Sequence, residues 1–388
     1  MMAFFCNNIA CTQFVDNRIH VGASVFEEYL PLINGKKVGI VANQTTTVNG
    51  THLVDSLLSL GIEIEMVFSP EHGFRGKADA GEKVANEIDP STGLSIVSLY
   101  GKNKRKPSSQ LLDEIDVMIF DLQDVGVRFY TYISTMHYIM EACAENNIPL
   151  IVLDRPNPNG FYVDGPVLKS KYQSFIGMHP VSVVHGMTIG EYAQMINGEK
   201  WLKDSINCQL NVVKCQNYDH SKKYILPVPP SPNLPNMASV YLYPSLCFFE
   251  GTNVSVGRGT GYPFQVYGAP YIKNSSFKFT PKPSYGAKYP KHINANCYGE
   301  DLRVFDTSSF FKEPQLQFQW LISAYQSSKG QPHFFLKNGF FNLLSGDFAI
   351  RQMIEQGRSQ SEIKLSYQDE LQEFKEIRKK YLIYEDFE

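Results

Sequence analysis

Acidic, basic and amide side chains follow three apolar runs of this sequence. The polar segments SPEHGFRG (69–76), DLQDVGVRFYTY (121–132) and DRPNPNG (154–160) each begin where such a run ends. In an open parallel sheet, the loops beyond the carboxyl ends of the strands converge, and ligands bind there. We therefore expect one polar site that gathers the following side chains: Glu71, His72, Arg75, Asp121, Asp124, Arg128, Tyr130, Asp154, Arg155 and Asn157.

Single members of this set also have a structural interpretation. Asp154 could cap a turn and Asn157 could form an Asx-turn, because short polar side chains bond to nearby backbone groups. Their joint placement at strand ends is what favours a site over a series of unrelated turns.

Two glutamates near these segments could cleave a glycosidic bond. This reaction needs a carboxylic acid that protonates the leaving oxygen, and a second group that stabilises or attacks the sugar carbon. Glu71 suits the first role because it follows the apolar segment MVFSP, where partial desolvation favours a protonated acid. Glu82, in ADAGEKV, could be the second group, and Asp121 and Asp124 compete with it for that role.

Two later segments contribute further candidates. In HGMTIGEYAQMINGEKW (185–201), Thr188 and Glu191 have the spacing of a capping box, so we expect Glu191 to cap a helix rather than to catalyse. His185 precedes that cap and is expected to face the site. In FFEGTNVSVGRGTGYPFQVYGAP (248–270), Glu250 and Arg258 lie among glycines and could bind a polar group. The GRGTG stretch follows no clear strand and opens no clear helix, which argues against a nucleotide-binding loop.

The elements that must position these residues alternate along the first half of the chain. Short apolar runs predict buried strands, and the longer periodic segments between them predict helices. This alternation indicates an α/β fold, with a doubly wound, Rossmann-like parallel sheet. The expected strands lie at 38–42, 62–68, 117–120 and 150–153, and the expected helices at 52–60 and 131–146.

A proline-rich segment interrupts this pattern. LPVPPSPNLPN (226–236) can sustain neither a helix nor a central strand. We therefore place a Rossmann-like catalytic domain at residues 20–226 and a smaller α/β domain at 227–388, which ends in helices expected at 347–355 and 367–381.

The composition argues against some classes of function and favours others. The 36 basic and 39 acidic residues are well mixed and give a net charge of −3, so no broad basic surface is available for nucleic acid. The 22 Tyr and 26 Phe supply rings that can stack on sugars. The 7 cysteines form no metal-type CxxC pair and are expected to be buried thiols. The start, MMAFFCNNIACTQF, predicts the end of a secretory or lipoprotein signal, or else an irregular terminus.

An ordered series of motifs resembles the family of exo-acting β-N-acetylmuramidases, formerly a domain of unknown function. The resemblance runs from residue 38 to the C-terminus and rests on VGIVANQT, SPEHGFRG, AGEKV, DLQDVGVRFYTY, DRPNPNG, HGMTIGEYA, PPSPNLPN and FEGTNVSVGRGT. It implies a site in the cleft between a Rossmann-like domain and a smaller α/β domain. It also implies release of N-acetylmuramic acid from the non-reducing end of peptidoglycan fragments in the cell envelope. The two catalytic glutamates of the family match Glu71 and Glu82, and neither a cofactor nor a metal is implied.

Several alternatives stay open at this level. The acetamido group of the sugar could replace the second carboxylate. The lactyl carboxylate of muramic acid needs a cationic partner, for which Arg75, Arg128 and Arg258 compete, and Arg75 is our first choice. A metal-dependent envelope hydrolase could use Glu71, His72, Asp121, Asp124 and Asp154 as oxygen and nitrogen ligands. The same fold would also suit a muramic-sugar-binding protein without catalysis.

Overall fold

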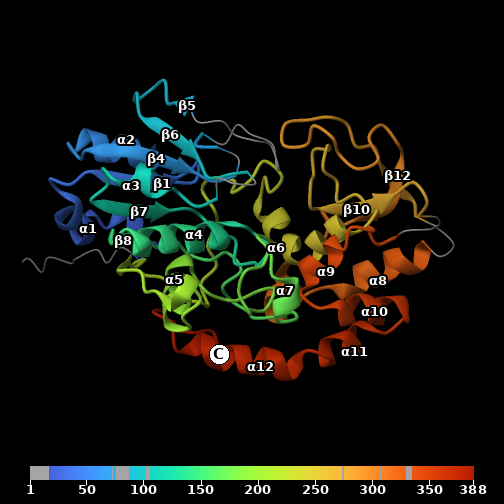
Figure 1. Ribbon diagram of the computed structural model, residues 1–388. Helices are drawn as coiled ribbons and strands as arrows, with labels where there is room; N and C mark the ends of the chain where they lie inside the picture. The colour runs from blue at the N-terminus through green and yellow to red at the C-terminus, as the bar shows by residue number, and fades with distance from the viewer. Residues whose placement is uncertain are drawn as a thin grey trace, which may run out of the picture.

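The computed structural model describes residues 17–71, 73–75, 87–101, 105–272, 275–305, 307–328 and 334–388. Two regions make up the molecule (Figure 1): a large sheet with helices on both faces, and a second region with a small sheet and several helices. Within the described residues, no helix is both long and apolar enough to cross a membrane.

The large sheet has seven strands in the order β5-β6-β4-β1-β7-β8-β9. All neighbours pair in parallel except β5, which pairs antiparallel with β6 at the edge. Counted along the chain, the six parallel strands have the order 3-2-1-4-5-6 of the doubly wound Rossmann fold, which confirms the expected fold class. The strands are β1 (Val38–Ala42), β4 (Ile64–Ser69), β5 (Glu87–Ile88), β6 (Ser95–Ser98), β7 (Val117–Asp121), β8 (Leu150–Leu153) and β9 (Leu210–Val213).

Alternate residues of these strands belong to two different hydrophobic clusters, one on each face of the sheet. In β1, Ile40 and Ala42 join one cluster, and Val41 joins the other. Helices α1 (Phe26–Ile33) and α2 (Leu53–Ser59) cover the first face, while α3 (Ser109–Leu112), α4 (Tyr132–Glu145) and α5 (Ile189–Gly198) cover the second. Because both faces are buried, the strands appear in the sequence as continuous apolar runs.

The four strands and two helices expected in the first half are all present, with shifts of one or two residues at their ends. Strands β6 and β9 were not predicted, nor was the two-residue edge strand β5. Ser95 and Ser98 interrupt the apolar run in β6, and β9 is a partly exposed edge strand, so neither has the continuous apolar pattern of the inner strands. A short hairpin of β2 (Thr47–Val48) and β3 (Thr51–His52) follows β1.

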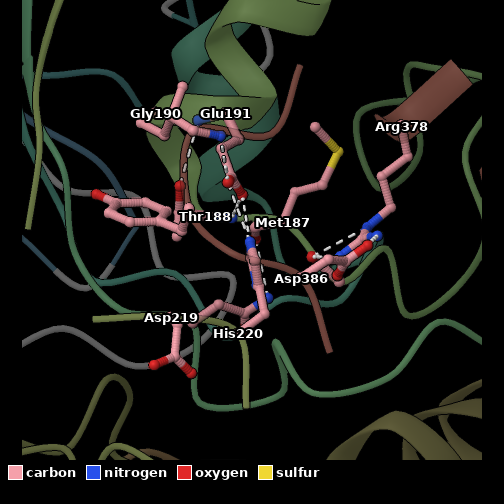
Figure 2. Close-up of polar contacts among 12 residues, drawn as sticks. Met187, Thr188, Gly190, Glu191, Asp219, His220, Arg378 and Asp386 are labelled. Carbon is pink, nitrogen blue, oxygen red and sulfur yellow. Dashed lines mark hydrogen bonds and ion pairs between the residues drawn. The ribbon is translucent and has the colours of Figure 1, made fainter. Parts of the chain in front are cut away.

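The capping box predicted for α5 is confirmed. The Thr188 hydroxyl accepts from the Glu191 backbone N–H at 3.3 Å, and the Glu191 carboxylate accepts from the Thr188 N–H at 2.9 Å. The other Glu191 oxygen lies 3.0 Å from Nε2 of His220, a contact drawn in Figure 2. Glu191 is therefore fully engaged in structure, as the sequence indicated.

The second region begins after the proline-rich segment 226–236, which forms no helix or strand. Its antiparallel sheet has the order β10-β12-β11 and packs beside a group of short helices. Its elements are α6 (Met237–Leu246), the 3-10 helix η4 (Cys247–Gly251), β10 (Val266–Ala269), β11 (Phe277–Phe279), β12 (Cys297–Asp301), α7 (Thr307–Lys312), α8 (Phe318–Ser327), α9 (Phe340–Ser345), α10 (Phe348–Glu355), α11 (Gln360–Leu365) and α12 (Gln368–Lys379). The last two expected helices correspond to α10 and α12.

The C-terminal segment returns to the first region. Figure 1 shows α12 along the lower edge, with the chain end beneath α5. Arg378 of α12 pairs with Asp386 at 2.7 Å (Figure 2). It also donates to the Gly186 carbonyl at 2.7 Å. Beyond the helix, the Tyr384 hydroxyl donates to Asp154 at 2.7 Å. The two regions are thus tied together by buried polar contacts near the C-terminus.

Gly299 in the central strand of the small sheet offers a test of this packing. A Cβ there would lie 1.9 Å from the Tyr267 carbonyl and 2.6 Å from Cα of its cross-strand partner Gly268. Backbone atoms cannot move aside cheaply, so Gly299→Ala should destabilise the protein by about 1–3 kcal/mol or more, the range for overpacking. Urea unfolding measures this loss. Gly261→Ala is the control, because a Cβ there meets nothing within 4 Å, and equal unfolding midpoints for the two variants would contradict the packing described.

Candidate functional site

A cavity of about 90 Å³ lies where the two regions meet. Its first wall comes from loops beyond the carboxyl ends of β4 and β7, and its second from the proline-rich segment and the loop after η4. The lining residues are Glu71, Phe129, Tyr130, Thr131, Tyr132, Ser231, Asn233, Leu234, Tyr243, Arg258 and Phe264. Strand-end loops therefore meet the second region here, as expected for a sheet whose strand order reverses at β1.

Hydrogen bonds fix the tyrosines of the first wall. Asn43, directly after β1, donates to the Tyr132 hydroxyl at 2.6 Å, and the Tyr130 hydroxyl donates to the Pro230 carbonyl at 2.8 Å. The two rings meet edge to face with centroids 4.8 Å apart. Burial raises the pKa of both hydroxyls well above the ordinary value, so both remain protonated at neutral pH. The wall is therefore uncharged, and its phenolic oxygens can accept hydrogen bonds from a polar ligand.

Glu71 is the carboxylate of this cavity. It follows β4 by two residues and is half-buried. The Tyr100 hydroxyl bonds to it, and burial together with the negative charge of Glu71 raises the pKa of Tyr100 to about 12. A neutral phenol that donates to a carboxylate limits its orientation. The carboxyl group is therefore held in place at the cavity wall.

The second wall carries a positive group. Arg258 Nε donates to Glu250 at 3.2 Å, and the guanidinium carbon lies 4.9 Å from the centroid of the Phe264 ring. The Lys291 ammonium donates to the carbonyls of Phe249 and Thr252 at 2.9 and 2.8 Å, which fixes the loop that carries Glu250. Burial would raise the pKa of Glu250, but the charges of Arg258 and Lys291 hold it below its ordinary value. Glu250 is therefore ionised and orients Arg258.

Phe264 lines the cavity in a strained conformation. Its φ is 55°, in the left-handed region that a bulky side chain seldom adopts. A backbone hydrogen bond of 2.7 Å to Val256 and an edge-to-face contact with Tyr243 at 5.0 Å hold it there. Such strain costs about 1–3 kcal/mol and is typical of ligand sites.

The predicted site residues divide into distinct groups. Glu71, Tyr130 and Arg258 line the cavity, and Glu250 contacts Arg258. Arg75 does not line it, because its guanidinium pairs with Asp89 at 2.8 Å and with Asp55 at 3.6 Å. Our first choice for the partner of the lactyl carboxylate is therefore not supported by the geometry. His72 and Glu82 lie outside the described residues.

Asp121 and Arg155 form a buried ion pair instead of facing the cavity. The guanidinium bonds to both carboxylate oxygens at 2.5 and 2.8 Å, and both side chains are almost fully buried. A paired buried carboxylate of this kind stabilises the loops around it but is unavailable as a second catalytic acid.

Arg128 is also committed to the interior. It donates to the carbonyls of Pro166 and Val181 in the first region and of Leu344 and Ser345 in the second. Burial without a carboxylate partner lowers the pKa of Arg128 to about 9. Its contacts support a structural role between the two regions.

Asp154, Asn157 and His185 likewise point to backbone and side-chain partners inside the protein. Asp154 accepts from Thr188, Gly190 and Tyr384, and burial raises its pKa to about 6. The Asn157 amide donates to the Met187 carbonyl at 2.9 Å. His185 is buried and its pKa is lowered to about 3, chiefly by desolvation. For these three residues the structure supports the structural interpretation rather than a contact with substrate.

The sequence did not single out several lining residues. Tyr132 and Phe264 lie in segments from which other residues were chosen, and Ser231 and Asn233 lie in the proline-rich segment. The motif PPSPNLPN was the available signal, because a proline-rich linker that also carries Ser and Asn can present polar groups in a fixed geometry. The metal interpretation gains no donor cluster, since the described residues hold no group of three or more His, Cys, Asp or Glu side chains that could bind a metal ion. The five cysteines that the structure describes are free and buried, as expected.

These features define a two-domain α/β protein with a polar site in the cleft between its domains. The chain belongs to the exo-β-N-acetylmuramidase NamZ family: the model of the N-terminal domain matches residues 38–238, and the model of the C-terminal domain matches residues 241–384. The models meet at the start of α6, slightly beyond the boundary that we placed at 226/227.

Relatives support the assignment over nearly the whole chain. The peptidoglycan β-N-acetylmuramidase NamZ of Bacillus subtilis is 40% identical over 381 residues, which are 93% of this chain and 90% of that protein. A DUF1343 family protein of Bacteroides fragilis has a solved structure with a TM-score of 0.88 and 45% identity, covering 95% of this chain and 99% of that one. A second such protein from the same species has a TM-score of 0.80 and 29% identity, covering 95% and 100%.

Asp124, a predicted site residue that is buried and does not line the cavity, gives a pH-dependent prediction. Burial raises its pKa from 3.8 to about 7, so between these values the folded protein holds a proton that the unfolded chain has released. Stability then falls as the pH rises through this window. Asp124→Asn removes the titration and keeps an acceptor for the Gly126 N–H, which lies 2.6 Å from Oδ2 of Asp124. As the pH rises from 4 to 8, the unfolding free energy of the variant should increase relative to that of the wild type by on the order of 1–3 kcal/mol.

Urea unfolding at pH 4, 6 and 8 measures this gain. Asp113→Asn, at an exposed aspartate, is the control and should leave the pH dependence unchanged. A pH dependence in Asp124→Asn as steep as in the wild type would show that this carboxyl does not hold the proton.

Proposed function

We propose that this chain is a glycosidase that releases N-acetylmuramic acid from the non-reducing end of peptidoglycan-derived saccharides. The observation that carries the proposal is the placement of the Glu71 carboxylate and the Arg258 guanidinium in one interdomain cavity. The similarity to a peptidoglycan β-N-acetylmuramidase over nearly the whole chain supports the same substrate class.

In this reaction Glu71 is the general acid. It transfers its proton to the glycosidic oxygen as the bond from that oxygen to the anomeric carbon breaks. Water then supplies the hydroxyl that the sugar gains, and its remaining proton returns to Glu71. Tyr100 holds the carboxyl group in one orientation, and the phenolic oxygens of the first wall accept hydrogen bonds from sugar hydroxyls. The second group is Glu82 or the acetamido oxygen of the substrate, because Asp121 is paired with Arg155, and Asp124 is buried and accepts from the Gly126 N–H.

The proposed substrate indicates where in the cell the enzyme acts. Muramic acid occurs in the bacterial wall, so we infer that the enzyme acts in the cell envelope on fragments from wall turnover. The N-terminal segment on which we based a signal or lipid anchor lies outside the described residues.

Glu71→Gln tests the assignment of the acid. With a disaccharide of N-acetylmuramic acid and N-acetylglucosamine, kcat should fall about 10²- to 10⁴-fold, the usual contribution of an acid–base group. With an aryl β-N-acetylmuramide the loss should be much smaller, because a good leaving group needs little protonation. Steady-state kinetics on both substrates measures the contrast.

Glu63→Gln, at an exposed glutamate just before β4, is the matched control and should retain full activity on both substrates. If Glu71→Gln keeps more than about a tenth of the turnover of the disaccharide, Glu71 is not the acid. Tight binding of muramic sugars by the wild type without any turnover would instead favour the non-catalytic binding protein.

A further inference from the structure

The guanidinium of Arg258 is only partly used within the protein. Nε donates to Glu250, and one face lies over the Phe264 ring. Both Nη groups have no hydrogen-bond partner among the described residues, although the side chain is only 24% exposed and lines the cavity. These Nη groups can therefore donate to a ligand in the cavity, in exchange for water.

The three other arginines of the predicted site bond to partners within the protein. Arg75 is bidentate to Asp89, Arg155 is bidentate to Asp121, and Arg128 is surrounded by backbone carbonyls. Of these four arginines, Arg258 is the one that lines the cavity and retains free donors.

The surroundings of Arg258 also fix its direction and favour an anion. Glu250 bonds to Nε, which leaves the edge with the Nη groups open, and Lys291 anchors the loop through backbone carbonyls. Two cationic side chains face one carboxylate in this cluster, so a positive charge remains uncompensated. A guanidinium held this way suits a carboxylate, to which it can donate two parallel hydrogen bonds.

We propose that Arg258 binds the lactyl carboxylate of muramic acid and thereby determines that the enzyme accepts muramic sugars rather than N-acetylglucosamine. The inference rests on the proposed function, because it names the part of that substrate which the second domain recognises. Glu71 on the first wall then acts at the glycosidic oxygen while Arg258 on the second wall holds the ether-linked lactyl group of the same sugar. Glu250 is a positioning residue that acts through Arg258.

Arg258→Gln tests the proposal with two aryl β-N-acetylmuramides, one with a free lactyl carboxylate and one with its neutral methyl ester. KM for the free acid should rise about 10- to 100-fold, the loss expected when hydrogen bonds to a charged group are removed. KM for the ester should change much less, so the preference of the wild type for the acid disappears. Glu250→Gln should shift the same ratio in the same direction with kcat retained.

Two further variants separate recognition from folding. Glu250→Gln combined with Arg258→Gln removes both charges of the pair, so no carboxylate loses its partner, and it should show the same loss of preference. Arg351→Gln, at a surface arginine of α10 paired with Glu355, should leave both KM values unchanged.

The outcomes distinguish this proposal from the proposed function. If Arg258→Gln raises KM for the free acid and for the ester by the same factor, or changes neither KM, Arg258 does not recognise the carboxylate. The muramidase activity would still stand. If the wild type cleaves neither muramide, nor the disaccharide, the proposed function fails first. Binding of free N-acetylmuramic acid and of N-acetylglucosamine, measured by calorimetry on the wild type and Arg258→Gln, gives a readout independent of catalysis. Equal binding of both sugars by the wild type overturns the proposal.

Discussion

The reversal of strand order at β1 is the constraint on which the site depends. Strand β1 lies between β4 and β7. After β4 the chain continues toward the β5 edge of the sheet, and after β7 it continues toward the β9 edge. A crevice therefore opens beyond the carboxyl ends of β1 and its neighbours, and a second domain can close it. Glu71 after β4, Asn43 after β1 and Tyr130 after β7 all owe their proximity to this single topological feature.

A cleft between two domains has a useful geometry only if the domains keep their positions. Here the contacts between them are buried and charged: Arg128 bonds to carbonyls of both domains, and Arg378 bonds to Gly186 while paired with Asp386. Removing one partner of such a buried contact leaves an unsatisfied charge, which is far more costly than the contact is worth in isolation. A movement that breaks these contacts would leave buried charges without partners. This cost opposes opening of the cleft in addition to the loss of packing.

Apolar periodicity made the inner strands and the long helices predictable, because burial on both faces leaves a clear pattern in the sequence. The runs at β1, β7 and β8 were identified for this reason, whereas the edge strand β9, with Asn211 exposed, was not. The capping box of α5 was predictable because its bonds are local.

The site was predictable only in part. Position at a strand end indicated Glu71 and Tyr130 correctly as cavity residues, but it applied equally to Asp154 and Asn157, which bond inward. The direction in which a side chain points depends on partners distant in the chain, such as Tyr384 for Asp154, and no local pattern contains that information.

The division of the cavity between the domains has a chemical consequence. The first domain supplies a carboxyl group held by a neutral phenol, while the second supplies a guanidinium held by a carboxylate. Each group has its own support on its own wall, Tyr100 for the acid and Glu250 for the cation. The strained backbone of Phe264, which places its ring beneath Arg258, is consistent with a wall that is built to hold one orientation of that side chain.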